Sequence, residues 1–269
     1  MGLALEVIAG QATAIGAGPT NLPALAGSTL TVRNARLDSR VMLLQAWAFL
    51  QVAGFIQIRS PKLHDNVRGI RVAEPAAAAQ PRLPDRFKQP LIPQDVLIFE
   101  GSAVDAAGDI ESAFALVWYE DLAGTQSRLI TTSDFQNRCV NLLTVYSDHV
   151  LGVAGGFSGE EAINADSDLL KANTDYAILG YLSDTARGGV FWRGIDTGNL
   201  RVGGPLLTGV QSEIVTRNWF YDLAENYDLP MIPVFNSANK GGFLVDFAGD
   251  ENAGTVILQT IIAELTPAK

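Results

Sequence analysis

The chain has 269 residues, of which 48% are hydrophobic and only 18% are charged, whereas an average soluble domain has about 25% charged residues. Nineteen basic and 29 acidic residues leave a net charge of −10, which repels phosphate backbones and anionic lipids and disfavours direct nucleic-acid binding. The 26 Gly and 12 Pro favour strands and turns, so the composition predicts a mainly β protein.

The N-terminal segment is uncharged from residue 7 to residue 32 and is interrupted by Pro19 and Pro23. A membrane-spanning helix tolerates such breaks poorly, so we predict an N-terminal arm over residues 1–27 that lies on a neighbouring molecule. Residues 1–5 lack the basic residues that open a signal peptide, so we expect synthesis in the cytoplasm without a cleaved leader.

A second uncharged stretch runs from Val41 to Ile58. Gln45, Gln51 and Gln57 would lie on three sides of a helix but share one face of a strand, so the spacing argues against a membrane helix. The opposite strand face would then be an apolar row that contains Met42, Leu44, Ala46, Ala48, Leu50 and Val52. We therefore predict two strands here, separated at Gly54.

Short apolar runs bounded by turn residues continue along the chain. In the first half they predict strands at 28–34, 41–52, 55–59, 66–72, 95–100, 113–120, 127–132 and 138–146. In the second half they predict strands at 176–182, 189–193, 199–202, 231–235, 242–247 and 255–264.

Two helices are predicted. Ser158 and Glu161 are spaced like a capping box, which indicates a short helix in the Gly-rich linker at 151–169. The clearest helix covers 212–227, where apolar side chains recur every four residues and Pro230 follows the end. We expect Trp219, Phe220 and Leu223 to anchor this helix.

Segments of the two halves match in order. Residues 87–93 match 227–233 around a shared Leu/Met-Ile-Pro, with Pro93 opposite Pro233, and residues 104–109 match 245–250, with Gly108 opposite Gly249. Residues 66–68 likewise match 199–201. These matches indicate a duplicated unit of roughly 140 residues, the size of a jelly roll. The alternative is that Asp, Gly and Pro recur because they form turns in any β protein.

Residues that carry chemistry are sparse. Cys139 has the apolar neighbours Val140, Leu142 and Leu143, so we expect a buried structural thiol. His64 and His149 are the only histidines and are far apart in sequence, which favours packing or surface roles over metal binding.

Three further patterns were weighed as sites. Residues 156–160 fail the G-x-S-x-G nucleophile motif at the last position, and Gly16-Ala17-Gly18 lacks a dinucleotide-binding context. Four aspartates recur between the halves and could bind Ca²⁺, although turn capping explains them as well; they are Asp105, Asp109, Asp246 and Asp250. We therefore assign no catalytic, cofactor-binding or metal-binding residue and expect no enzyme activity and no cofactor.

A β protein with few charges, a duplication of jelly-roll length and a helix before residues 230–233 resembles the double jelly-roll major capsid proteins of tailless icosahedral viruses, especially internal-membrane bacteriophages. Members of that family commonly carry a helix in the first half too, where this chain has the Ala- and Pro-rich segment 73–86.

The resemblance implies two tandem jelly-roll β-barrels with a few short helices, divided as a 1–27 arm, a first jelly roll at 28–150, a linker at 151–169 and a second jelly roll at 170–269. It implies a structural protein of the virion that forms homotrimers, which then build the capsid lattice beside minor capsid or vertex proteins and an underlying membrane. Two alternatives stay open. One is a carbohydrate- or receptor-binding β-sandwich with exposed aromatic residues, which the placement of Trp47, Trp118, Trp192 and Trp219 within predicted elements disfavours; the other is a hydrolase with a dispersed carboxylate pair.

Overall fold

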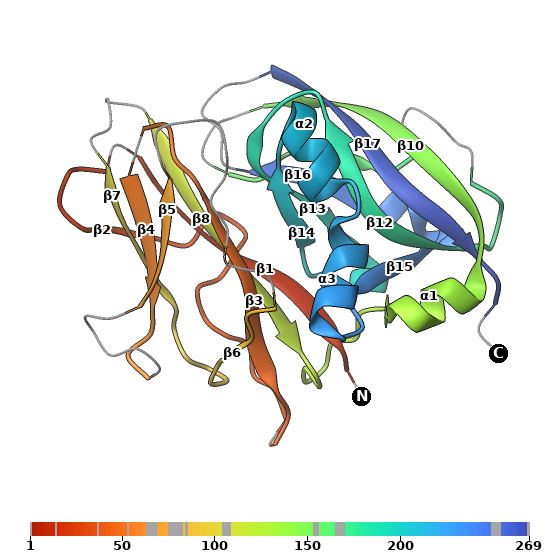
Figure 1. The fold of residues 1–269 in the computed structure, drawn as a ribbon, viewed down its shortest axis with the longest axis horizontal. Coiled ribbons are helices and arrows are strands. Elements are labelled where there is room, and N and C mark those ends of the chain that lie inside the picture. The colour runs from red at the N-terminus through yellow and green to blue at the C-terminus, as the bar shows by residue number, and fades with distance from the viewer. Residues whose placement is uncertain are drawn as a thin grey trace.

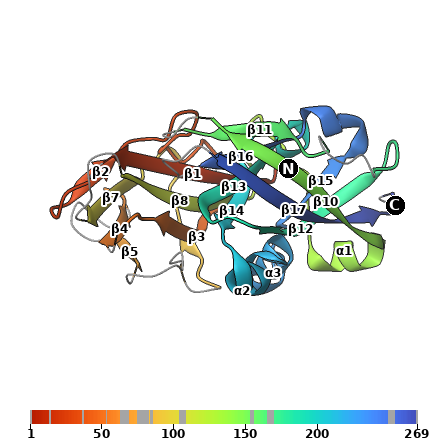
Figure 2. The ribbon, with the colours of Figure 1, turned by 90° about the horizontal axis from the view of Figure 1, so that it is seen from above.

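A computed structural model describes the chain at 2–13, 15–36, 38–52, 54–62, 69–74, 83, 86–103, 109–152, 156–164, 170–248 and 254–267. The protein is mainly β, with strands β1 to β17 in four sheets and a few short helices. The first-half strands and the second-half strands lie side by side along the longest axis of the molecule (Figures 1 and 2).

The first half holds eight strands in two antiparallel sheets. Their bounds are β1 (Ala4–Thr13), β2 (Thr20–Leu22), β3 (Val41–Phe49), β4 (Gly54–Arg59), β5 (Ile70–Glu74), β6 (Gln89–Pro90), β7 (Ile98–Ala103) and β8 (Ile110–Tyr119). One sheet has the order β1-β8-β3-β6 and the other β2-β7-β4-β5. Apart from β4 and β5, neighbouring strands are not consecutive in the chain, as in a Greek-key sandwich.

The second half repeats this order. Its strands are β9 (Leu129–Ile130), β10 (Cys139–Leu151), β11 (Ser158–Ala162), β12 (Asp175–Ser183), β13 (Arg187–Arg193), β14 (Val202–Leu206), β15 (Ile232–Asn236), β16 (Leu244–Ala248) and β17 (Gly254–Leu265). The sheets run β10-β17-β12-β15-β9 and β11-β16-β13-β14. Apart from the added β9, β10 to β17 take the places of β1 to β8, an order consistent with a jelly-roll sandwich in each half.

The predicted helix over 212–227 is present but interrupted. It consists of α2 (Gly209–Gln211), the π-helical turn η2 (Ser212–Thr216) and α3 (Trp219–Tyr227). A Cβ at Gly180, where the pairing of β12 with β17 is bulged, would collide with the carbonyl oxygen of Arg217 between η2 and α3. The glycine therefore lets the helical segment lie directly on β12. Other short helices are α1 (Thr132–Arg138), η1 (Ile195–Thr197) and η3 (Ser237–Gly242).

The sheet that contains β1, β8 and β3 is buried on both faces. Val41, Leu43 and Ala46 of β3 belong to the core inside the first half, whereas Leu44 and Trp47 belong to a core shared with the second half. The pairing of β3 with β8 shifts between Leu43 and Gln45, which moves later residues to the opposite face. The predicted division into a glutamine face and an apolar face is therefore wrong, because this bulge and the second core bury both sides.

Other expectations also need correction. The predicted arm contains β1, which pairs with β8 along its whole length, because small apolar residues suit a strand buried on both faces. The predicted capping box at Ser158 and Glu161 belongs to strand β11, which pairs with β16. Within the predicted strand at 28–34, the structure has only an isolated bridge at Thr31.

Sheet membership moves the predicted boundaries as well. β1 and β2 belong with the first half, and β10 opens the second half rather than closing the first. The division into independently folding domains stays a prediction.

The matched sequence segments can be compared with the strand order only in part. Residues 199–201 precede the fifth strand of the second half, β14, whereas residues 66–68 lie outside the described residues, so their match stays a prediction. The segments at 87–93 and 227–233 each overlap a sixth strand, β6 or β15, but at different residues. Pro93 follows β6 whereas Pro233 lies within β15, so the two prolines do not hold the same strand position as predicted. Gly108 and Gly249 lie outside the described residues, so that match stays a prediction.

Candidate functional site

A buried serine–histidine pair lies on β10, where the sequence motifs had not indicated one. The Ser147 Oγ and His149 Nε2 atoms are 2.8 Å apart, and His149 Nδ1 lies 2.9 Å from the carbonyl oxygen of Gly159 on β11. Their i, i+2 spacing on a strand places both side chains on one face, and this short spacing is not part of the longer catalytic motifs. Both side chains are buried, and the His149 ring packs 4.8 Å from Phe247. The pair links β10, β11 and β16 within the core; His64 lies outside the described residues.

Asp246 is the recurring aspartate that the structure places in a charged cluster. Its buried carboxylate on β16 accepts a 2.7 Å hydrogen bond from Arg201 Nε and lies 3.6 Å from Arg193 Nε. Burial raises the pKa of Asp246, although Arg201 opposes the shift. Asp105 and Asp250 lie outside the described residues, and Asp109 lies just before β8. Among the residues described, no group of three or more His, Cys, Asp or Glu side chains could hold a metal ion.

A second charged cluster lies where the ends of β10, β12, β15 and β17 meet. The Asp175 carboxylate accepts hydrogen bonds from Arg128 at 2.6 Å and from Asn236 at 2.8 Å, and Arg138 approaches to 3.4 Å. Burial opposes the shift, but the hydrogen bonds from Arg128 and Asn236 lower the pKa of Asp175. A cavity of about 310 Å³ opens beside Asp175, with Glu264 on its wall already paired to Lys171. The negative charges of these carboxylates are balanced by arginine and lysine side chains, so the presence of the carboxylates is explained without a bound ligand.

The outer edge of β1 is covered by two segments of the same chain. Gln11 N donates to Pro23 O at 2.8 Å and Leu25 N donates to Ala9 O at 2.9 Å, so the segment after β2 lines this edge. Val7 N donates to the carbonyl oxygen of Arg201 at 2.8 Å, which brings the second half against the same edge.

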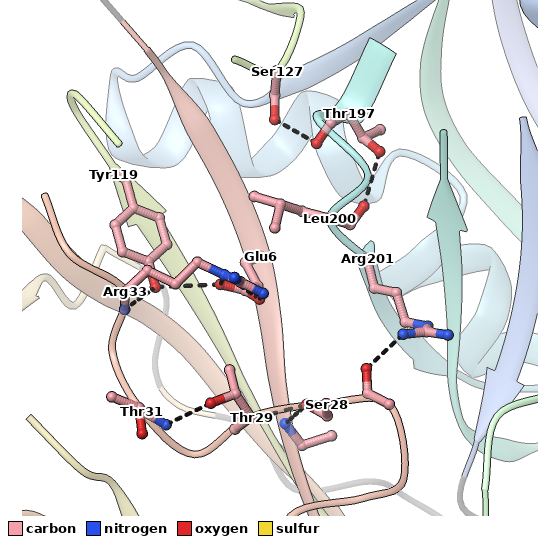
Figure 3. A network of polar contacts seen from close by, with 12 residues as sticks. Glu6, Ser28, Thr29, Thr31, Arg33, Tyr119, Ser127, Thr197, Leu200 and Arg201 are labelled. Atoms are coloured by element: carbon pink, nitrogen blue, oxygen red, sulfur yellow. Dashed lines mark hydrogen bonds and ion pairs between the residues drawn. The ribbon is translucent and has the colours of Figure 1, made fainter. Parts of the chain in front are cut away.

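Figure 3 shows the polar contacts that support this junction. The Arg201 guanidinium donates to Gly27 O at 2.8 Å. The same guanidinium stacks over the Phe157 ring at 3.7 Å. Nearby, Glu6 of β1 accepts hydrogen bonds from Arg33 at 2.7 Å and from the Tyr119 hydroxyl at 3.3 Å (Figure 3). Burial and the Glu6 carboxylate raise the pKa of Tyr119.

Aromatic side chains fill the rest of the contact between the halves. Trp47 of β3 stacks on Phe114 of β8 with centroids 5.3 Å apart, and it meets Trp219 of α3 edge-on at 6.2 Å. Phe114 also packs 5.7 Å from Phe191 of β13. Gly203 lies opposite Phe191 in the pairing of β13 with β14. The first half therefore packs against β13, β14 and α3 of the second half.

The equivalent edge strand of the second half, β10, is open instead. Its even-numbered side chains point outward, and four of them are apolar and exposed: Val140 (57%), Leu142 (60%), Tyr146 (41%) and Val150 (69%). We call these four residues the β10 face. β10 is 13 residues long and ends its sheet among the described strands, at the outer right edge in Figure 1. A long edge strand with exposed apolar side chains is a template for pairing with another chain.

Cys139 begins this strand and is exposed, so the expectation of a buried thiol is wrong. Its apolar neighbours indicated a core, but Val140 and Leu142 belong to the β10 face. The pKa of the Cys139 thiol is raised by partial burial, which keeps the thiol protonated near neutral pH.

Next to β10, a shallow cleft of about 300 Å³ runs between β17 and the α2–η2 segment. Ile257 and Gln259 of β17 line it, and they pair with Asp148 and Tyr146 of β10. Directly opposed residues of an antiparallel pair point to the same side, so the cleft and the β10 face form one continuous surface.

All four tryptophans are buried in the core. None of these tryptophans is therefore available for the exposed aromatic cluster that the lectin-like alternative requires. None of the helices in the described part of the chain is both long enough and apolar enough to span a membrane.

No known family model and no curated protein matches this sequence. Among solved structures, the PBSX exported protein XepA aligns over 96% of this chain and 86% of its own, with 9% identity and a TM-score of 0.26. The major capsid protein P2 from bacteriophage PM2 aligns over 98% of both chains, with 8% identity and a TM-score of 0.24. At TM-scores this low, neither similarity supports a conclusion about fold or function.

Proposed function

We propose that the protein is a double jelly-roll structural protein, a major capsid protein that assembles as a homotrimer into the shell of an icosahedral virion. The observation that carries the proposal is the shared strand order. Among the described residues, β1 to β8 and β10 to β17 both follow the sheet orders 1-8-3-6 and 2-7-4-5 when each set is numbered from one, with β9 as an addition. Two copies of one sandwich in a single chain favour a shell subunit, because three such chains supply six similar building blocks around one axis.

The surface supports a role in assembly. Only 18% of the residues are charged, and the β10 face presents four apolar side chains on an open edge strand. Burial against neighbouring subunits would give both features a cause. Among the described polar residues that the sequence singles out, His149 is buried and Asp246 is paired with Arg201, which favours a structural role for these two side chains.

Mass photometry of the purified full chain at micromolar to nanomolar concentration, at neutral pH and moderate salt, tests the proposal. We expect a trimer of a 28.7 kDa chain, and larger closed or curved assemblies in negative-stain electron micrographs at higher concentration. A stable monomer throughout this range would overturn the proposal.

A further inference from the structure

The first strands of the two halves hold the same place in the fold but have different surroundings. The edge of β1 is covered by the 23–25 segment and by Arg201. The outer face of the sheet that contains β1 is covered by Phe191, Trp219 and their neighbours from the second half. The corresponding strand of the second half, β10, presents four exposed apolar side chains, and no other described strand lies beyond it. The first half is therefore covered at its first strand by the second half, whereas the second half leaves its first strand, β10, exposed beside the helical segment that covers β12.

The elements that cover the first half are identifiable by their order. β13 and β14 are the fourth and fifth strands of the second half, and they bring Phe191 and the Arg201 carbonyl to the first. In the first half, β4 and β5 hold the fourth and fifth places. A surface equivalent to the one that covers β1 therefore exists on β4 and β5.

The outer face of β4 and β5 is not part of the cores described above. Phe55 and Gln57 of β4 are half-buried, whereas Ile56 and Ile58 point into the first-half core. Arg71 of β5 is exposed and lies over the Phe55 ring at 3.8 Å. This guanidinium-over-phenyl contact resembles that of Arg201 over Phe157 at 3.7 Å in the second half.

From these placements we propose that the β10 face of one copy is covered by the β4–β5 face of a second copy, which repeats between chains the contact that joins the two halves within one chain. The contact is head-to-tail, so it uses two different surfaces and leaves one of each free for a further copy. The inference rests on the proposed self-assembly, and three such contacts would close a ring of six halves.

The distribution of charge favours this partner over a second β10 face. Residues 1–127 contain 10 basic and 12 acidic side chains, whereas residues 128–269 contain 9 basic and 17 acidic ones. Pairing two second halves would bring together the two most acidic surfaces, and pairing a second half with a first half avoids that repulsion.

The exposed apolar area of the β10 face is comparable to part of a standard protein–protein interface. The four side chains of the β10 face expose roughly 400 Å², about half of the ~800 Å² that each partner buries in a standard interface. The adjoining cleft and the exposed Val210 and Ile214 of the α2–η2 segment extend the same surface.

Cross-linking tests the partner directly. In a Cys139→Ser background, Thr144→Cys places a thiol on the outer side of β10 and Arg71→Cys places one on β5, with a flexible bis-maleimide as the cross-linker. We expect the double variant to give cross-linked products up to three chains, and each single variant to give none. Dimers from Thr144→Cys alone would mean that two β10 strands meet, which overturns the proposed partner.

A charged substitution on the β10 face tests this inference independently of the proposed function. Leu142→Asp should raise the dissociation constant of the assembly at least tenfold, while Ile195→Asp, at a similarly exposed position (66%) outside both faces, should leave it unchanged. Equal melting temperatures of the dilute variants would show that both fold. If the wild type assembles but Leu142→Asp assembles equally well and the double variant does not cross-link, this inference is wrong and the proposed function stands. If the wild type is monomeric throughout, both fail.

Discussion

Truncation of the Trp219 side chain should lower the stability of both halves of the molecule. It is buried at the start of α3, its Nε1 donates to Gly203 O at 3.2 Å, and its ring meets Trp47 of the first half at 6.2 Å. Truncating a buried tryptophan costs about 3–5 kcal/mol, because the site loses the apolar contacts and keeps a cavity. For a chain of this size, Trp219→Ala should lower the melting temperature by roughly 6–20 °C.

Two further variants separate the contribution of the Trp219 ring and its hydrogen bond from a general effect of mutating the helix. Trp219→Phe keeps an aromatic ring but removes the hydrogen bond to Gly203, so we expect an intermediate loss that includes about 1 kcal/mol for that bond. Glu225→Ala changes an exposed residue of the same helix and should alter the stability by no more than about 0.5 kcal/mol.

Urea unfolding followed by far-ultraviolet circular dichroism gives the free energy of unfolding of each variant. Because Trp219 contacts both halves, we expect the whole unfolding transition of Trp219→Ala to move to lower urea. An unchanged midpoint for Trp219→Ala, or an equal loss in Glu225→Ala, would refute the anchoring role.

Three other variants test separate parts of the structure. Gly180→Ala should destabilise by several times more than Gly241→Ala in urea unfolding, because a Cβ at Gly180 collides with the Arg217 carbonyl whereas Gly241 has no atom within 4 Å; equal effects would contradict the close packing of η2 and α3 on β12. Asp175→Asn should cost about 1–3 kcal/mol at neutral pH and should flatten the acid side of the stability profile. The sign follows from its lowered pKa: the charged Asp175 stabilises the fold above its ordinary pKa near 4, and that contribution is lost as the pH falls through the folded value, so an unchanged acid profile would refute it. Ser147→Ala should cost about 1–3 kcal/mol, because it removes a partner from buried His149, and a melting curve identical to wild type would count against the structural role of the pair.

The sequence predicted the fold class and many of its elements because their patterns are local. The helix over 212–227 followed from apolar spacing, and α3 buries Trp219, Phe220 and Leu223 as expected. Apolar spacing did not indicate the π-helical turn η2, whose end packs against Gly180, a residue far away in sequence.

The errors at the N-terminus and in β3 have a different physical origin. A strand normally alternates because one face meets water, but β1 and β3 meet a core on each side. An uncharged, Gly-containing segment such as residues 4–13 then resembles a flexible arm, although β1 is buried along most of its length. Only the packing of the second half on the first distinguishes the two.

The error at Cys139 has the opposite origin. The apolar residues Val140 and Leu142 indicated a core, yet they point outward from an edge strand. An apolar sequence indicates that its side chains are stabilised by burial. It does not indicate whether they are buried by the same chain or by another molecule. In the first half the cover of β1 is the rest of the chain, with Arg201 as its clearest contact. In the proposed assembly, β10 is the strand that receives equivalent cover, and a second copy of the chain supplies it through β4 and β5.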